Sequence, residues 1–440
     1  MKLKLPNFQG VFLALRAPAL IACAVLLSTL IPQARAHIVL DGSYPAVICP
    51  GALGGGGERI SLPAKNLSTR VVTGKSAAVK IHSSTVIVGS VAPTFVSGNP
   101  GSEIAFLSIS GASTADAVCE VGGIDQWFIG GSAGVTSQGI LEIINSGLSD
   151  SVVQVFPYSS KVALAPISLT IKANSAQNIA LATLVPGEES IALHVVTESG
   201  RVSSFLLDHR KNGLNDLGAS FVTPVAAPTT TSYISGLFGS ATKAASTMRF
   251  LVPGNISANV HVTIFSGGGI ITPVGFDSLT IPRQRVVDVP LPKISLSTPY
   301  GIEVTSDQPI FASALTKKIS GGLDFAWANQ LTPLSNFKIN LAGAAGQFFF
   351  MGRTVAIKAQ WIDSKGKANS TVISGDASAP WHPSGSLNQI TFTPLTKEAM
   401  YGGALISNSD GGLNYLPLLA NQLIARGELP IADLRTLTRH

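Results

Sequence analysis

Charged side chains, long apolar runs and cysteines are all scarce in this sequence of 440 residues. Asp, Glu, Lys and Arg make up 12% of it, about half of their usual share in a soluble domain. Beyond residue 36, no apolar stretch reaches the roughly 20 residues that a membrane-spanning helix needs. No run of Lys or Arg is long enough to follow a phosphate backbone. We therefore expect no nucleic-acid partner, and membrane contact only through the N-terminal segment.

The first 36 residues have the pattern of an export signal. Basic residues precede an apolar run at 19–30, and Ala34 and Ala36 provide the small residues that a signal peptidase reads. Cleavage after Ala36 would start the mature chain at His37, and retention of the segment as an N-terminal anchor is the alternative. A lipoprotein site at Cys23 is disfavoured because the chain stays apolar beyond it. Both remaining alternatives predict an extracytoplasmic protein, either secreted or at the cell surface.

Most of the positive charge belongs to this segment. The chain has 30 basic and 24 acidic residues, and residues 1–36 hold four of the basic ones and none of the acidic ones. The rest of the chain therefore carries a net charge of only +2. Its composition gives no reason to expect an acidic membrane surface or a polyanion as partner.

Only Cys49 and Cys119 remain once the signal is removed. An even pair of cysteines in an exported chain predicts a disulfide, and two free buried thiols are the alternative. Neither cysteine has a His or a second Cys at ligand spacing, so no metal site is expected here.

Alternation of polar and apolar residues dominates the chain after the signal. Segments such as 168–171, 259–264 and 302–312 alternate with period two, and Gly, Pro, Asn and Ser interrupt the runs every 8–12 residues. This pattern is typical of strands with one buried face in an all-β sandwich or barrel. A turn is expected at Ser306 and Asp307.

The pattern also returns about every 108 residues. Ser168–Ile171 recurs as Ser278–Ile281, and a predicted closing hairpin at 193–202 recurs at 302–310. Fainter copies are indicated at 404–416 and, before Cys119, at 79–86. A period of this length suits a complete sandwich of immunoglobulin type better than a solenoid rung or a single propeller blade.

The sequence thus predicts an all-β chain of tandem immunoglobulin-like β-sandwich repeats after a signal segment. We expect these parts along the chain: signal or anchor 1–36, N-terminal β region 37–122, β-sandwich repeat 1 at 123–228, β-sandwich repeat 2 at 229–336, degenerate β-sandwich repeat 3 at 337–425, and C-terminal tail 426–440. Linkers are expected at 223–231 and 331–335, where Pro and Thr or Ser gather.

Motifs that suggest catalysis each have a simpler interpretation. Gly130–Gly134 matches the nucleophile elbow, but a strand is expected after it where the elbow needs a helix. The glycine runs at 54–57 and 267–269 are not followed by the Lys and helix of a phosphate loop, and we interpret them as turns. Asp208, His209 and Arg210 are interpreted as a surface charge cluster. We therefore predict no catalytic residue, metal or cofactor.

Aromatic residues provide the one candidate binding feature. The tryptophans Trp127, Trp327, Trp361 and Trp381, with Phe348–Phe350, could line a sugar-stacking face, and Trp361 and Trp381 are the candidate ligand platform. Core packing is the simpler interpretation, because aromatic side chains most often fill sandwich cores. Phe348, Phe349 and Phe350 are consecutive, and alternation along a strand must place at least one of these rings on the opposite face. That ring needs a partner domain or a ligand to cover it.

Several of these segments together resemble a known family. Ile48–Gly51, Cys119, Gly122–Gly123, Trp127–Gly131 and the strand Ile140–Asn145 are similar to an actinobacterial family of exported or membrane-anchored proteins that carries only a domain-of-unknown-function label. The resemblance spans roughly 45–425, and it departs from the family at Asn145-Ser146, where Asn-Pro is usual. It implies an extracytoplasmic β architecture and a Cys49–Cys119 bridge, and it implies no activity or cofactor.

The sequence favours a non-enzymatic structural or binding protein of the cell envelope or the secreted space, with an envelope glycan or protein as partner. A carbohydrate-binding accessory module of the cell wall is the first alternative. An unrecognised secreted hydrolase is the second, and it would need an acid and a base from different repeats to meet in one cleft.

Overall fold

The computed structural model describes residues 46–419 apart from sixteen short gaps. The gaps lie at 54–56, 63–66, 74–77, 82–84, 89–91, 98–103, 109–112, 162–163, 241–244, 295–297, 319–322, 342–344, 364, 384, 386 and 408–411. The predicted signal, most of the glycine run at 54–57, His82 and the C-terminal tail lie outside the described residues. Among the described helices, none combines the length and apolar character needed to cross a membrane.

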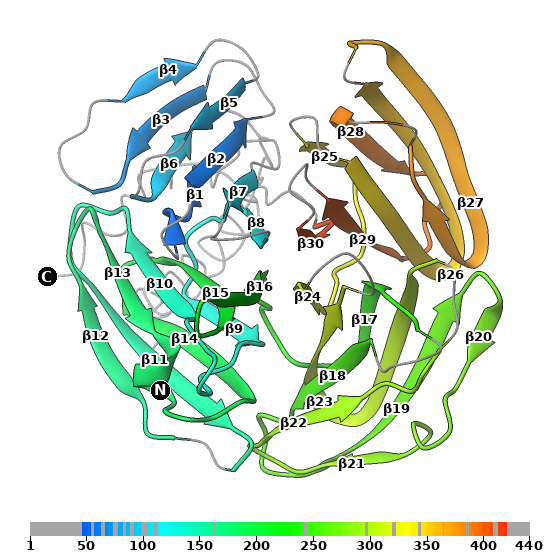
Figure 1. Cartoon of the computed structure of the whole chain (residues 1–440), viewed down its shortest axis with the longest axis horizontal. Helices are drawn as coiled ribbons and strands as arrows, with labels where there is room; N and C mark the ends of the chain where they lie inside the picture. The colour runs from blue at the N-terminus through cyan, green and yellow to red at the C-terminus, as the bar shows by residue number, and fades with distance from the viewer. Residues whose placement is uncertain are drawn as a thin grey trace, which may run out of the picture. The chain divides into compact units, whose positions relative to one another are not determined.

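The described residues form four units, and one strand order in two antiparallel sheets recurs in all of them (Figure 1). We number the strands of a unit from one to eight along the chain. Hydrogen-bonded neighbours then follow the order 1-6-3-4 in the first sheet and 5-2-7-8 in the second. The chain passes from one sheet to the other several times within each unit. Apolar residues of both sheets face each other, so each unit is a sandwich. The prediction of an all-β fold of sandwich-like repeats is confirmed.

The N-terminal unit contains β1 to β8 in this order. Its strands are β1 (Val47–Cys49), β2 (Gly57–Leu62), β3 (Leu67–Val71), β4 (Val79–Ile81), β5 (Thr85–Val88), β6 (Thr94–Ser97), β7 (Ile104–Ser108) and β8 (Thr114–Val118). Its sheets are β1-β6-β3-β4 and β5-β2-β7-β8. What the sequence indicated as a partial copy is therefore a complete one.

Unit 1 has the same order in β12-β11-β14-β9 and β13-β10-β15-β16. Its elements are β9 (Asp125–Ile129), β10 (Ile140–Asn145), β11 (Ser151–Ser159), β12 (Ile167–Ile171), β13 (Ser175–Ala180), the helical turn α2 (Leu181–Leu184), β14 (Ile191–Ser199), β15 (Ser203–Asn212) and β16 (Asn215–Val222). Along β11 burial alternates at every residue, as the period-two pattern predicts. Val153 and Val155 enter the core, while Phe156 and Tyr158 point to the other face.

Unit 2 repeats the order with one strand shared between its sheets. Its strands are β17 (Thr229–Leu237), β18 (Ser246–Leu251), β19 (Ala258–Ser266), β20 (Gly269–Ile271), β21 (Leu279–Ile281), β22 (Val286–Pro290), β23 (Tyr300–Lys317) and β24 (Phe325–Asn329). The first half of β23 pairs with β17 and β19, and the second half pairs with β18 and β24.

Unit 3 is built from six strands because two of them serve both sheets. Its strands are β25 (Phe337–Asn340), β26 (Ala345–Asp363), β27 (Ala368–Trp381), β28 (Leu387–Pro394), β29 (Met400–Ser407) and β30 (Leu413–Pro417). β26 pairs with β29 through its first half and with β28 through its second, and β27 pairs with both halves. The strand order of the other units is thereby preserved.

The predicted closing hairpins are wrong in three of the four places. Residues 193–202 and 302–310 are crossings from one sheet to the other, and β23 continues through Ser306 and Asp307 without a turn. At 79–86, β4 and β5 belong to different sheets. Only 404–416 is a hairpin, formed by β29 and β30. A strand that crosses between sheets keeps the same alternation as a hairpin, so the sequence pattern does not distinguish them.

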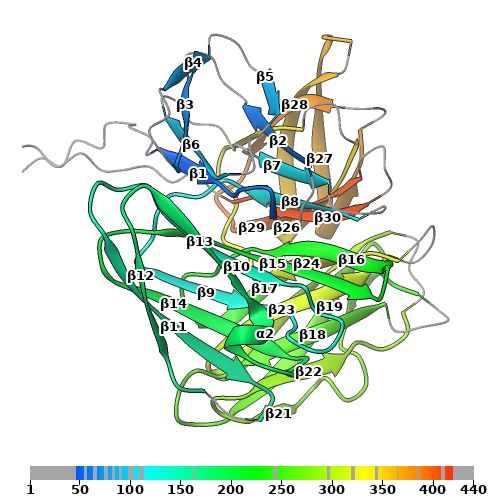
Figure 2. The ribbon, with the colours of Figure 1, turned by 60° about the vertical axis from the view of Figure 1, so that its left-hand side comes forward.

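The last strands of the four units contact one another in a cycle. β8 lies against β16, β16 against β24, β24 against β30, and β30 against β8. Figures 1 and 2 both show these four strands side by side. Every residue of β24 and of β30 is buried. The units are therefore joined laterally as well as through the chain.

The predicted linker at 223–231 is packed into a joint instead of spanning a gap. Val225 is buried and forms a backbone bridge with Trp127. The amide of Asn329 donates a hydrogen bond to the Thr223 carbonyl, and the amide of Gln330 donates to that of Ala227. The segment is therefore held by both neighbouring units, and its last three residues, 229–231, belong to β17.

A disulfide joins Cys49 to Cys119, 70 residues apart. It lies beside the backbone bridge between Ile48 and Glu120, which is the counterpart in the N-terminal unit of the Trp127–Val225 bridge in unit 1. The first strand of a sandwich is thus tied to the segment after the last strand. In unit 1 apolar packing around Trp127 supports this tie, and in the N-terminal unit a covalent bond does so.

We predict that the double variant Cys49→Ser/Cys119→Ser is less stable to urea than the wild type. A bridge that closes a loop of this length contributes on the order of 4 kcal/mol in the chain-entropy model. Urea unfolding followed by circular dichroism measures the difference, with the wild type under reducing conditions as control. A difference below about 1 kcal/mol would contradict a structural role for the bridge.

Candidate functional site

Ser132 in the Gly-rich segment is unsuited to act as a nucleophile. Its side chain is fully buried, and its Oγ donates a hydrogen bond to Glu189 Oε2 at 2.9 Å. The segment leads from β9 to β10 without a helix, so it lacks the strand–turn–helix geometry of a nucleophile elbow. The Ser132 oxygen also accepts a hydrogen bond from the Gly134 amide at 3.2 Å. It therefore stabilises its own loop.

The prediction that Asp208, His209 and Arg210 form a surface cluster is wrong. Asp208 and His209 are buried, because β15 lies between β10 and β16 and both of its faces are covered. Asp208 accepts hydrogen bonds from Arg210 Nη2 at 2.7 Å and from Trp327 Nε1 of unit 2 at 2.9 Å. His209 points the other way, and its Nε2 lies 3.4 Å from Asp216 Oδ1. Alternation separates the neighbours on opposite faces of the sheet.

Arg249 of β18 joins units 1 and 2. Its guanidinium donates to both carboxylate oxygens of Asp288 at 2.7 and 2.8 Å. It also donates to the backbone carbonyls of Gly131 and Ile191 at 2.6 and 2.9 Å, and it lies 4.7 Å from the Trp327 ring centroid. The planar five-donor group suits such a buried joint. The guanidinium of Arg249 therefore connects unit 1 to unit 2.

Asp324 connects three units through their backbones. Its Oδ1 accepts hydrogen bonds from the amides of Phe325 at 2.9 Å and Ala219 at 3.2 Å, and its Oδ2 accepts one from the Leu413 amide at 2.7 Å. Burial raises the pKa of this carboxyl to about 7, although the three amide donors act in the opposite direction. Gly218 has a positive φ, and a Cβ there would lie 2.7 Å from Asp324 Oδ1, so the close approach requires glycine.

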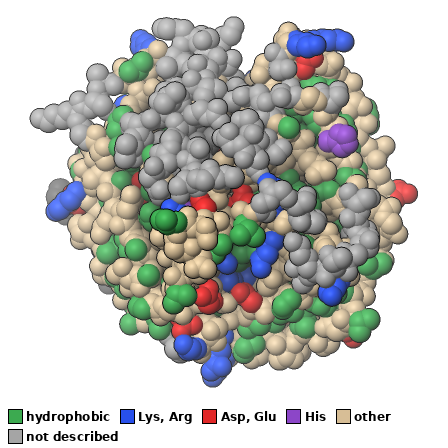
Figure 3. All heavy atoms as spheres, in the orientation of Figure 1, with side chains coloured by type: hydrophobic (Ala, Val, Ile, Leu, Met, Phe, Trp, Pro, Cys, Tyr) green, Lys and Arg blue, Asp and Glu red, His purple; other side chains and the backbone are tan. Residues whose placement is uncertain are grey.

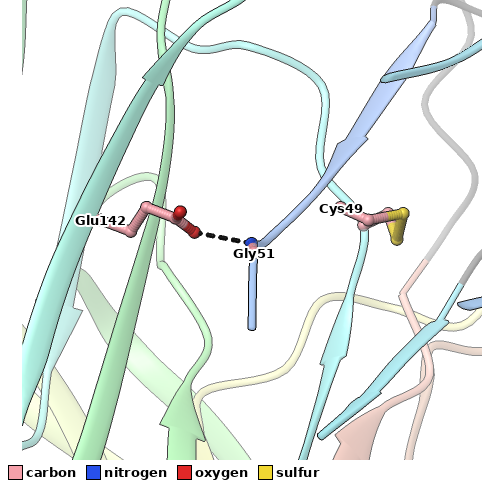
Figure 4. Close-up of a disulfide and its surroundings, with 4 residues drawn as sticks. Cys49, Gly51 and Glu142 are labelled. Carbon is pink, nitrogen blue, oxygen red and sulfur yellow. Dashed lines mark hydrogen bonds between the residues drawn. A yellow bond between two sulfur atoms is a disulfide. The ribbon is translucent and has the colours of Figure 1, made fainter. Parts of the chain in front are cut away.

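Glu142 of β10 makes the corresponding contact between unit 1 and the N-terminal unit. Its Oε2 accepts a hydrogen bond from the Gly51 amide at 3.0 Å, next to the disulfide (Figure 4). Burial raises the pKa of Glu142 to about 7. Burial also raises the pKa of Glu120, which accepts a hydrogen bond from Gln126. Two carboxyl groups with raised pKa thus lie close to this joint, and each has a structural partner.

The predicted platform residues Trp361 and Trp381 lie together on unit 3. Their ring centroids are 5.3 Å apart with the planes 66° from each other. Both are partly buried against the apolar core of unit 3, and Trp381 also contacts Phe348 and Phe392. The two indoles form a corner, so they do not offer one flat surface. Their role as a ligand platform stays a prediction.

Phe349 confirms the expectation that a ring on the opposite face needs a cover. Phe348 and Phe350 enter the core of unit 3, whereas Phe349 packs with Phe265 of unit 2 and with Met351. Nearby, Tyr233 of unit 2 stacks on Tyr401 of unit 3 with 3.9 Å between ring centroids. The cover is the neighbouring unit.

Sequence reasoning named Trp127 as a possible stacking ring but missed the aromatic group around it, on the face of unit 1 that packs partly against unit 2. Trp127 and His194 stack with ring centroids 3.6 Å apart, and Phe156 and Tyr158 of β11 lie beside them. Asp125 accepts a hydrogen bond from His194 Nε2 at 2.9 Å. The available signal was the placement of these residues at alternating positions of three segments, but strand pairing is needed to bring them together.

The face in Figure 3 shows apolar side chains scattered among polar ones, with basic and acidic side chains close together near its middle. No group of three or more His, Cys, Asp or Glu in the described part of the chain is placed to hold a metal ion.

One protein-family profile matches more than half of this chain. The profile of DUF5719, a family of unknown function, matches residues 108–374. The chain belongs to the DUF5719 family. The match begins within β7 of the N-terminal unit and ends within β27 of unit 3, so it includes units 1 and 2 completely.

Other comparisons add little to the DUF5719 assignment. A search of curated proteins found no significant match. Among solved structures, a tetra-tandem repeat from the extending region of a large adhesion protein aligns over 87% of this chain and 98% of its own, with 11% identity. Its TM-score of 0.12 is too low to indicate a shared fold.

We predict that Glu142→Gln changes how stability depends on pH. The folded pKa of about 7 lies above the ordinary value of 4.5, so the folded state holds a proton that the unfolded state releases. This group therefore favours folding at low pH, and its contribution is lost as pH rises from about 4.5 to 7. Gln keeps an acceptor for Gly51 but does not titrate. The variant should lose less stability than the wild type between pH 5 and pH 8 in urea unfolding, and an unchanged difference would contradict the assignment.

We also predict that Asp324→Asn destabilises the protein by about 2 kcal/mol, because the amide group leaves at least one of the three backbone donors without an acceptor. Urea unfolding at pH 8, above the pKa of Asp324, measures the loss against the ionised carboxylate. The exposed Asp376 provides the control variant Asp376→Asn, which should change stability by less than about 0.5 kcal/mol. Equal effects of the two variants would show that Asp324 does not hold the units together.

Proposed function

We propose that this DUF5719 protein is an exported, non-enzymatic structural and binding protein of the cell envelope or the secreted space. The main support is the use made of its buried ionisable side chains. Asp208, Arg249, Asp324 and Glu142 all make contacts between units. A catalytic acid or base has to reach a substrate, and these groups are already bonded to the protein's own backbone or side chains.

Export is supported by two further features. The N-terminal segment has the composition of a cleaved signal. The Cys49–Cys119 disulfide suits an oxidising compartment. A protein built from laterally joined sandwiches and fixed by a disulfide is well suited to hold a binding face in a fixed position outside the cytoplasm.

We predict that expression of the full chain in a bacterial host with a general secretion pathway yields an extracytoplasmic protein that starts at His37. Intact mass and N-terminal sequencing of the exported fraction measure this. Replacing Ala34 and Ala36 by bulky residues should block cleavage and leave the chain membrane-bound. Recovery of the wild type only inside the cytoplasm would contradict the proposed location.

The purified protein should also leave envelope polymers intact. Incubation with peptidoglycan and with envelope polysaccharides, followed by assay of reducing ends and released amines, should give the same values as buffer. Turnover that is abolished by a single side-chain substitution would overturn the non-enzymatic assignment and favour the hydrolase alternative.

A further inference from the structure

The strand β27 is a free edge of unit 3. It pairs with β26 on one side, and none of the described strands pairs with its other side. Figure 1 shows β27 along the outer margin of unit 3. The free edge ends at Ala377, which packs with Phe265 of unit 2 and has a positive φ of 65°. Residues 368–376 therefore present backbone N–H and C=O groups that no described strand uses.

This edge lacks the usual protection against pairing with another chain. Edge strands of natural proteins are commonly blocked by a charged residue, a proline or a bulge. Two other edge strands here follow that rule, since β4 contains Lys80, and β22 contains Asp288 and Pro290. Residues 368–375 of β27 include no charged residue and no proline, and their register with β26 is unbroken. The stretch is open to pairing, and an extended polypeptide is the partner that satisfies such an edge.

We propose that this edge of β27 pairs with the same edge of a second copy of the chain, antiparallel and about a two-fold axis at Val372. Antiparallel pairing of identical strands places one residue opposite itself, because paired residues lie on the same face of the sheet. Val372 is 60% exposed and would lie opposite its own copy. The exposed Ser370 would lie opposite Ser374. Apolar pairs and hydroxyl pairs both stabilise neighbouring strands.

The charges beside the stretch make it complementary to itself. Lys367 precedes it and Asp376 follows it, and both are exposed. In the antiparallel arrangement Ala368 of one copy lies opposite Asp376 of the other, so the long side chain of the adjacent Lys367 comes within reach of that carboxylate. The two-fold axis repeats this contact at the other end. A parallel arrangement would instead bring like charges together, which is unfavourable.

Self-association goes beyond the proposed binding role, because it concerns how the chains assemble. The sheets of two copies would join into one continuous sheet through β27. The net charge of +2 beyond the predicted signal adds little repulsion between copies. An interface formed mainly by one strand from each copy is small, so the dimer is weak and reversible.

The first test measures the mass of the full exported chain in solution. Sedimentation velocity and light scattering should show a monomer–dimer equilibrium at concentrations of about 1 to 100 μM. Val372→Lys places two ammonium groups opposite each other and should raise the dimer Kd by about tenfold or more. Val135→Lys, at a fully exposed valine of a unit 1 loop, is the matched control and should leave the Kd unchanged.

Charge reversal tests the direction of pairing. Lys367→Asp and Asp376→Lys should each raise the dimer Kd several-fold, because each brings like charges together at both ends of the paired strands. The double variant should restore the wild-type Kd, since the two charges have only exchanged places. A purely structural role of either residue within its own chain would give no such restoration. Two weakened single variants without restoration in the double variant would overturn the antiparallel arrangement.

Engineered cysteines test the register. In a Cys23→Ser background, mild oxidation of Val372→Cys should give disulfide-linked dimers, because this position lies opposite itself. Ser370→Cys and Ser374→Cys should each stay unlinked alone but link when mixed. Thermal unfolding shows whether each variant is folded, and non-reducing electrophoresis measures the linkage.

The remaining outcomes separate this inference from the proposed function. A monomer at every concentration, a dimer that Val372→Lys leaves intact, or linkage in Ser370→Cys alone but not in Val372→Cys would overturn the β27 dimer and leave the non-enzymatic role standing. An edge that captures an extended peptide from another envelope protein, with no dimer, would overturn it as well. A β27 dimer that also degrades envelope polymers would support the pairing but refute the non-enzymatic function.

Discussion

Each sandwich in this chain has more apolar surface than its own core can bury, and the next unit has to cover the surplus. Ile48 of the N-terminal unit packs among residues of unit 1, Trp127 of unit 1 packs against Phe311 of unit 2, and Phe265 of unit 2 packs against Phe349 of unit 3. Burial of apolar area is the main favourable term in folding. The four closing strands contact one another because this requirement recurs at each joint.

The same joints explain where the ionisable residues lie. An extended strand that enters a joint still has amide and carbonyl groups to satisfy, and buried polar groups without partners are costly. Asp324 and Glu142 accept backbone amides from other units, and Arg249 donates to backbone carbonyls across its joint. Burial raises the pKa of both carboxyls to about 7. Such groups resemble catalytic ones in their burial and their pKa, and their partners identify them as parts of the assembly.

The sequence predicted which side chains share a face of one strand better than it predicted how the strands pair. Alternation placed Phe349 opposite its two neighbours, and the structure covers it with unit 2. It also suggested a hairpin at 302–310, where β23 passes between two sheets. Asp208 and His209 were expected at the surface because they are polar, whereas the central position of β15 buries both. Trp127 and His194 are 67 positions apart in the chain, and only the β9–β14 register stacks their rings.

The alternation of polar and apolar residues alone determined that this chain forms strands and that the segments 168–171 and 278–281 recur in neighbouring units, because side-chain period is a property of the strand itself. The sequence also limited disulfide formation beyond the signal to Cys49 and Cys119, the two cysteines left there. The tertiary structure decided which polar residues are buried, which rings are covered, and which meet on an outer face. Those outcomes depend on contacts between residues far apart in the chain, and alternation within one strand carries no record of the partner across the joint.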